Sequence, residues 1–329
     1  MSSAHELGER KIIEIIEGIL DKMPNMPIQF GDDVSAIDIG DGKLAVLKVD
    51  MLVGKTDVPP GMSMRQAARK TVVMNVSDFA AKGVKPIAIL TSLGLPKNTS
   101  EIEVEEIAKG LNEGAREYGA YIIGGDTSEA SELIINCMLT GTAKREEIVL
   151  RSTAKPGDIL AVTGYFGKTS SGLKILLEGL KVKSPELRNV LVDSVYTPKA
   201  HLKEGLALTK SKAVSASIDS SDGLAISLYW LRKMSNVGFR IFELPAAPEV
   251  KCFAEEFNLN LKELVLYGGE EYELVVTIDK DNWDLAQKAV KKVGGNLIQI
   301  GEVTKKREIV LNDGKVEEEI QIRGWEHFK

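Results

Sequence analysis

Apolar residues along this chain recur at helical spacing in some stretches and form short continuous runs in others. Residues three and four apart face one side of a helix, whereas short apolar runs between polar turns are typical of strands. The spacing predicts helices over 11–22, 65–84, 101–118, 222–232, 248–257 and 282–293, with another beginning at 170. Strands are expected at 43–49, 86–95, 120–123, 132–142, 158–163, 213–218, 273–278 and 297–303.

The irregular order of these elements favours an α+β fold over a doubly wound parallel sheet. A chain of 329 residues is long for one hydrophobic core, so two domains are expected. The polar segment 143–157 is the best candidate boundary because it combines a charged run with Lys155-Pro156-Gly157. We therefore predict an N-terminal domain over 1–148 and a C-terminal α+β domain over 149–329.

Composition argues against several classes of partner. The net charge is −6 and aromatic residues make up 5% of the chain, which argues against nucleic acid and against an anionic membrane surface. The polar N-terminus and the absence of a long apolar run predict neither a secretory signal nor a membrane span. The two cysteines are far apart in the sequence, as expected for reduced thiols in a cytoplasmic protein.

Aspartates in short turns, most of them beside Gly, Ser or Asn, are the main chemical signal. No Lys or Arg stands within any of these turns, and gathered carboxylates repel one another unless cations lie between them. Oxygen ligands favour Mg²⁺ or Ca²⁺, and Mg²⁺ usually accompanies substrate phosphates. The pattern therefore predicts a magnesium-dependent nucleotide enzyme. The turns are Gly31–Asp33, Val49–Met51, Asn75–Asp78, Gly124–Thr127 and Asp219–Gly223.

Each turn taken alone has an ordinary structural alternative. Gly31–Asp33 is compatible with a common turn, and Gly124–Thr127 with either a phosphate-binding nest or a tight hairpin. In Asp219–Gly223, one residue would suffice as a helix N-cap, yet two carboxylates and two hydroxyls occur in four residues. Gly167-Lys168-Thr169 is not a P-loop, because that motif requires glycine where Val162 stands.

Read together, these motifs resemble the thiamine-monophosphate kinase family, in the superfamily of aminoimidazole ribonucleotide synthetase. The resemblance implies ATP-dependent phosphorylation of thiamine monophosphate to thiamine diphosphate, with Mg²⁺ as cofactor. It also implies a homodimer in which the mixed N-terminal sheets pair into a barrel. Three further segments carry the resemblance: Ala154–Asp158, Gly268–Glu270 and Gly324–Phe328.

The resemblance also assigns roles to single positions. It implies Mg²⁺ ligation by Asp33, Asp50, Asp78, Asp126 and Asp219, with Asp222 on a further ion. It implies ATP contacts from Gly125, Asp126, Arg151 and Ser221. Glu270 and Trp325 would contact the thiamine part, where the Trp325 ring would stack on a cationic ring. No catalytic side chain is expected, because the attacking phosphate oxygen is already anionic and the ions assist direct transfer.

This chain departs from the family pattern at two places. Lys48-Val49 stands where many members have Ser-Thr, and these side chains cannot ligate Mg²⁺. Asp57 stands where many members have a substrate-contacting histidine, so a carboxylate would face the thiamine cation there. An aminoimidazole ribonucleotide synthetase-like enzyme is the catalytic alternative, and a non-catalytic nucleotide-binding protein is the alternative of another class.

Overall fold

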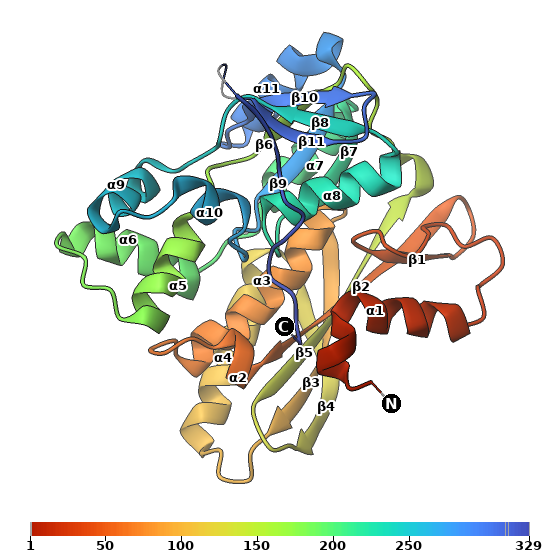
Figure 1. The fold of residues 1–329 in the computed structure, drawn as a ribbon. Helices are drawn as coiled ribbons and strands as arrows, with labels where there is room; N and C mark the ends of the chain where they lie inside the picture. The colour runs from red at the N-terminus through yellow and green to blue at the C-terminus, as the bar shows by residue number, and fades with distance from the viewer. Residues whose placement is uncertain (1, 313, 315, 329) are drawn as a thin grey trace.

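The structure is a computed structural model that describes residues 2–312, 314 and 316–328, and it contains two mixed sheets with helices packed between and around them (Figure 1). The helices of the described residues are α1 Ala4–Ile19, α2 Gly54–Asp57, α3 Met64–Lys82, α4 Glu101–Glu117, α5 Lys168–Glu178, α6 Pro185–Tyr196, α7 Leu202–Ser211, α8 Leu224–Ser235, α9 Pro248–Phe257, α10 Leu261–Leu266 and α11 Trp283–Lys292. The strands are β1 Ser35–Asp38, β2 Lys43–Val53, β3 Pro86–Leu95, β4 Tyr121–Glu129, β5 Ile134–Lys144, β6 Ile159–Val162, β7 Val214–Asp219, β8 Gly238–Ile241, β9 Leu274–Ile278, β10 Ile298–Thr304, β11 Ile309–Asn312 and β12 Glu317–Glu319.

The N-terminal sheet has the strand order β1-β2-β5-β3-β4, with only β3 and β4 parallel. Helix α3 packs on its inner face, against β2 and β5. Side chains alternate across a strand, so Lys48, Asp50 and Leu52 of β2 all point to this inner face. The outer face instead carries exposed apolar side chains, namely Val49, Met51, Ile87, Leu90, Tyr121 and Ile123.

The C-terminal sheet has the order β12-β11-β8-β10-β6-β9-β7. Its edge strand β7 contacts α3, so this helix lies between the two sheets. Strand β7 ends at Asp219, which is thereby delivered beside α3. The arrangement brings the ends of elements from both halves of the chain to one place.

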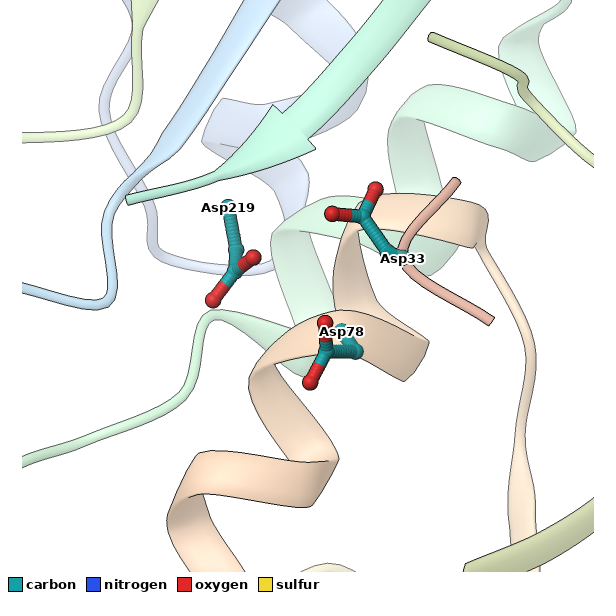
Figure 2. A group of neighbouring side chains, drawn as sticks. All are labelled: Asp33, Asp78 and Asp219. Atoms are coloured by element: carbon teal, nitrogen blue, oxygen red, sulfur yellow. The ribbon is translucent and has the colours of Figure 1, made fainter. Parts of the chain in front are cut away.

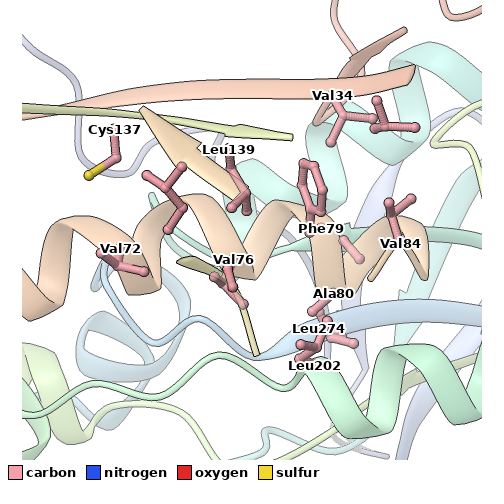
Figure 3. Close-up of a cluster of buried hydrophobic side chains, with 14 of the residues drawn as sticks. Val34, Val72, Val76, Phe79, Ala80, Val84, Cys137, Leu139, Leu202 and Leu274 are labelled. Atoms are coloured by element: carbon pink, nitrogen blue, oxygen red, sulfur yellow. The ribbon is translucent and has the colours of Figure 1, made fainter. Parts of the chain in front are cut away.

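Helix α3 is buried on almost every side, as expected for a helix that is rich in Ala and Val all around. Val72, Val76 and Phe79 belong to the core shown in Figure 3, where the Phe79 ring points toward Leu139 of β5 and Val34. Ser63 caps the first turn of α3 in a capping box with Gln66. Gly83 ends the helix with φ 66°, and a side chain there would clash with Thr209 on α7.

The predicted α+β class is confirmed, and α3, β3, α4 and α9 lie within two residues of their expected bounds. The expected turn at Gly124–Asp126 is wrong, because β4 runs through these residues to Glu129. As an exposed edge strand of small polar residues, β4 lacks the apolar alternation by which strands are recognised. Likewise, Asp50 lies inside β2 and not at its end, and α1 begins at Ala4.

Among the described residues, none of the helices combines the length and the apolar content that a bilayer crossing requires.

Candidate active site

A cavity of about 620 Å³ lies where the two halves of the chain meet. Its walls come from α1, β2, α3, the end of β7, α8 and the C-terminal segment. The lining includes six of the predicted site residues together with Lys48. These six are Asp50, Asp78, Arg151, Asp219, Ser221 and Asp222.

Three carboxylates converge beside this cavity. Asp33 follows the turn before β1, Asp78 lies on α3 and Asp219 ends β7, and their ligand oxygens all lie within 4.8 Å of one another (Figure 2). All three residues are buried. Two of the three come from the N-terminal half and one from the C-terminal half, so the cluster forms only when both halves are folded.

Basic side chains from other parts of the chain offset part of this charge. The Lys82 ammonium lies 2.6 Å from Asp33 Oδ2 and 2.7 Å from Asp32 Oδ1, and it also donates to the Ser217 carbonyl. The Arg151 guanidinium pairs with the other Asp33 oxygen and donates to the Gly31 carbonyl. No Lys or Arg stands within the acidic turns themselves, and tertiary packing supplies these cations from other parts of the chain.

Lys48 supplies a third cation. Its ammonium lies 3.0 Å from Asp78 Oδ1 and 3.2 Å from Asp50 Oδ1, and it joins α3 to β2. Asn75 supports the same contact, since its side-chain oxygen accepts the Asp50 backbone N–H. Lys48 was expected to be a position that contributes no ligand; the structure gives it a bridging place in the site.

The acids fall into two electrostatic groups. Burial alone would raise the pKa of Asp33, but the charges of Arg151 and Lys82 hold that pKa below its usual value. By contrast, burial raises the pKa of Asp219 to about 7 and that of Asp222 to about 6. Burial likewise raises the pKa of Asp78 well above its usual value, even though Lys48 opposes the shift.

The donor set suits Mg²⁺. Asp33, Asp78 and Asp219 offer only carboxylate oxygens, which are the ligands that this ion prefers. Within the part of the chain that the structure describes, no Lys or Arg lies at ion-pair distance from Asp219 or Asp222. The Ser220 hydroxyl between them is buried and has no hydrogen-bond partner there. The residues present therefore fit a divalent cation.

A second cluster surrounds Lys70, which lies eight residues before Asp78 on α3. Lys70 is 1% exposed, its ammonium donates to the Asp57 carbonyl at 3.0 Å, and it pairs with Glu270. The Asp57 carboxylate accepts the Val53 backbone N–H at 2.7 Å. Glu270 has φ 65°, an uncommon conformation for a residue other than glycine. Two of the predicted substrate residues are thus held by one lysine.

The third predicted substrate residue, Trp325, lies on the C-terminal segment. Its backbone N–H donates to the Asp222 carbonyl at 3.1 Å, while its side chain is about half exposed. Gly324 permits this approach, because a side chain there would clash with the same carbonyl. Further along, the His327 N–H donates to Glu9, so the segment links the Asp222 turn to α1.

Gly125 and Asp126 do not join the acidic cluster within one subunit. Asp126 on β4 lies opposite Ser92 on β3, and Ser92 lies opposite Asn136 on β5. Asn136 in turn lies opposite Met51 on β2, so these four residues form one row across the sheet. This row belongs to the outer face, whereas Asp50 points inward. Gly125 lies in the strand itself, where a side chain would clash with the Thr91 carbonyl of β3.

Two lysines of the site, Lys70 and Lys82, were missed by the sequence reasoning. Lys70, Asp78 and Lys82 are separated by multiples of four residues, which places them along one face of α3. Lysines within a helix that is otherwise rich in Ala and Val are a usable signal, because a buried lysine requires a partner.

The chain matches two family models, "AIR synthase related protein, N-terminal domain" over residues 31–143 and "AIR synthase related protein, C-terminal domain" over 155–314. It is 38% identical to the thiamine-monophosphate kinase of Pyrococcus horikoshii, covering 96% of each chain. It is also 36% identical to that of Nitrosopumilus maritimus, covering 98% of this chain and 99% of the relative. A solved structure described as AaThiL complexed with AMPPCP and TMP superposes with TM-score 0.85 and 27% identity over 99% of both chains. With relatives this similar along nearly its whole length, the chain belongs to the thiamine-monophosphate kinase family.

Proposed function

We propose that this protein transfers the γ-phosphoryl group of ATP to thiamine monophosphate and so forms thiamine diphosphate. The observation that carries the proposal is the convergence of Asp33, Asp78 and Asp219 from both halves of the chain. Its support is a family whose named members are thiamine-monophosphate kinases and a similar structure described with an ATP analogue and TMP.

Mg²⁺ would be held by Asp33, Asp50, Asp78, Asp219 and Asp222. When bound, the ions would offset the charge of the phosphates that must approach each other. Lys82 and Arg151 keep Asp33 ionised, so that this carboxylate is ready to act as a ligand. Arg151 and Ser221 are the proposed ATP contacts, together with Gly125 and Asp126.

The residues around Lys70 and on the C-terminal segment would position the acceptor. Lys70 holds Asp57, at the end of α2, and Glu270. The C-terminal segment places Trp325 beside Asp222 through a backbone hydrogen bond. Among the described residues of the site, none has the arrangement of an activated nucleophile, which supports direct transfer. Detection of a covalent phosphoprotein during turnover would contradict this mechanism.

A homodimer with a shared barrel is the second part of the proposal. Strand β4 is exposed on both faces, and the apolar outer face of the sheet has no cover within the described part of the chain. Asp126 on β4 is separated from Met51 on β2 by three strand-to-strand spacings, which amount to about 14 Å. A second copy on the outer face would cover the apolar residues and bring Asp126 to a site formed with its partner.

The dimer is tested by measuring the molar mass of the wild type and of Ile123→Glu by light scattering. We expect a dimeric wild type and a monomeric variant that keeps its circular dichroism spectrum but loses activity. A monomeric, fully active wild type would contradict the shared site. The cytoplasmic location and the domain boundary between residues 148 and 149 stay predictions.

One assay tests the activity directly. Purified protein is incubated with ATP, Mg²⁺ and thiamine monophosphate, and thiamine diphosphate and ADP are measured, with a parallel sample containing EDTA. We expect both products in equal amounts and only in the presence of Mg²⁺. Nucleotide binding without either product would favour a non-catalytic role. ATP turnover without formation of thiamine diphosphate would favour the aminoimidazole ribonucleotide synthetase-like alternative.

A further inference from the structure

Lys48 occupies a place in the site that a metal ion would be expected to take. Strand alternation puts Lys48 and Asp50 on the inner face of β2, opposite Asp78 on α3. The ammonium lies within hydrogen-bond distance of one oxygen of each carboxylate, at 3.2 Å from Asp50 and 3.0 Å from Asp78. A positive charge therefore already links these two acids across the gap between strand and helix.

Two carboxylates on different elements repel each other unless a cation lies between them. The Lys48 ammonium already lies in this position, and its side chain is mostly buried between β2 and α3. We propose that the Lys48 ammonium replaces one divalent cation, the one that would otherwise bridge Asp50 and Asp78. The inference rests on the proposed function only in treating these two acids as metal ligands.

The ion pairs leave room for the other ions. Lys48 contacts only Oδ1 of Asp50 and Oδ1 of Asp78, so the second oxygen of each remains available as a ligand. Asp219 and Asp222, which have no basic partner among the described residues, keep their capacity for cations. Displacing Lys48 would instead leave an ammonium that is mostly buried and unpaired, and such a group is costly to hold inside a protein.

The direct test locates Mn²⁺ in crystals of the wild-type protein, with Mn²⁺ alone and with Mn²⁺ and AMPPCP. Anomalous scattering at the manganese edge identifies the ions without any need for turnover. We expect manganese at Asp219, and the Lys48 ammonium still between Asp50 and Asp78. A manganese peak bridging Asp50 and Asp78, with Lys48 turned away, would overturn the proposal.

Counting bound ions gives an independent test. Bound Mn²⁺ is measured by electron paramagnetic resonance for the wild type, Lys48→Ser, Lys48→Gln and the charge-retaining Lys48→Arg. We expect one additional Mn²⁺ per subunit in Lys48→Ser, which supplies a hydroxyl ligand, and the wild-type number in Lys48→Arg. Lys48→Gln, which keeps the length of the side chain but no charge, should bind its ions about tenfold more tightly than the wild type because one repelling charge is gone.

Lys43→Ser is the matched control, since Lys43 lies on the same strand but is exposed at its start. Its manganese number should equal that of the wild type. Equal manganese numbers and affinities in the wild type, Lys48→Ser and Lys48→Gln would contradict the inference. Because these measurements use no thiamine monophosphate, failure of the proposed kinase activity would leave them readable.

Discussion

The acids of this site are held in two different ways, according to the half of the chain from which they come. Asp33, from the N-terminal half, has a basic side chain on each of its oxygens, and its pKa is lowered. Asp219 and Asp222, from the C-terminal half, have no such partner among the described residues, and burial raises their pKa to about 7 and about 6. The first arrangement is complete within the protein, whereas the second becomes favourable when a cation arrives from outside.

This difference separates two tasks that one acidic cluster must combine. A buried carboxylate that is already paired gives the site a fixed frame, because its charge does not depend on the ligand. An unpaired one is unstable when ionised and therefore gains most from a bound divalent ion. Asp78 lies between the two cases, since Lys48 pairs with one of its oxygens while its pKa remains raised.

The largest expected effect is the loss of activity when Asp219, a carboxylate without a basic partner among the described residues, is replaced. Asp219→Asn should lower kcat by about 10²–10³-fold, because the transferring phosphate loses one held ion. The fold should stay intact, since Asn is uncharged and can still accept from the Ser77 hydroxyl as Asp219 does. Steady-state kinetics and circular dichroism check this, with the exposed Asp284→Asn as control. A variant with the normal rate would remove Asp219 from the proposed ligands.

For Asp33, which is already paired within the protein, removal of a basic partner should mainly lower the free energy of unfolding. Lys82→Met leaves Asp32 and Asp33 without the ammonium that lies between them, and all three side chains are buried. Breaking a buried ion pair in this way costs about 3–5 kcal/mol of the free energy of unfolding. Urea unfolding measures the loss, and Lys85→Met, at an exposed position just after α3, is the control. A loss below about 1 kcal/mol would show that the frame does not depend on Lys82.

Ligand-linked stability tests the same comparison without any assay of turnover. Mg²⁺ should raise the melting temperature of the wild type, because it binds the folded site and offsets the charge of Asp219 and Asp222. At about 100 times the dissociation constant the gain is about 2.7 kcal/mol. Asp219→Asn should lose most of this gain, whereas Asp284→Asn should keep it. An equal gain in both variants would place the ion elsewhere.

The sequence allowed part of this site to be predicted, and the missing part has a physical cause. Asp33, Asp78 and Asp219 were predicted from local turn patterns, and the structure brings these three residues together. The pairing of Lys82 with Asp33 depends on how α3 packs against the Gly31–Asp33 turn, and no local pattern encodes that contact.

In the fold too, elements with local sequence signals were predicted, whereas elements that depend on long-range pairing were not. Helix α3 was predicted because the spacing of its apolar residues is a local feature. Strand β4 was cut short at Gly124 because its exposed edge needs no apolar alternation, and its pairing with β3 is a long-range property. Short elements such as β8 and α10 were missed for a related reason, since four to six residues carry little periodicity.

The smallest predicted effect concerns Glu271, which lies outside the proposed ligand set. Its pKa, like those of Asp219 and Asp222, is raised by burial. Burial raises its pKa to about 7, although it accepts the Gly167 N–H at 2.6 Å. A raised pKa in the folded state means that this group stabilises the fold below its unfolded pKa, near 4.5, and that the stabilisation is lost as pH rises through about 7.

Glu271→Gln keeps a side-chain oxygen for the Gly167 N–H but cannot ionise. The variant should therefore melt about 2–4 °C higher than the wild type at pH 8, and the difference should shrink toward pH 5. Melting curves from pH 5 to pH 8, recorded with EDTA to exclude metal ions, give this difference directly. The control is Glu101→Gln, at the exposed start of α4. A difference in melting temperature that does not change with pH would mean that burial does not raise the pKa of Glu271. The contrast between paired and unpaired buried acids would then apply only to the residues at the cavity.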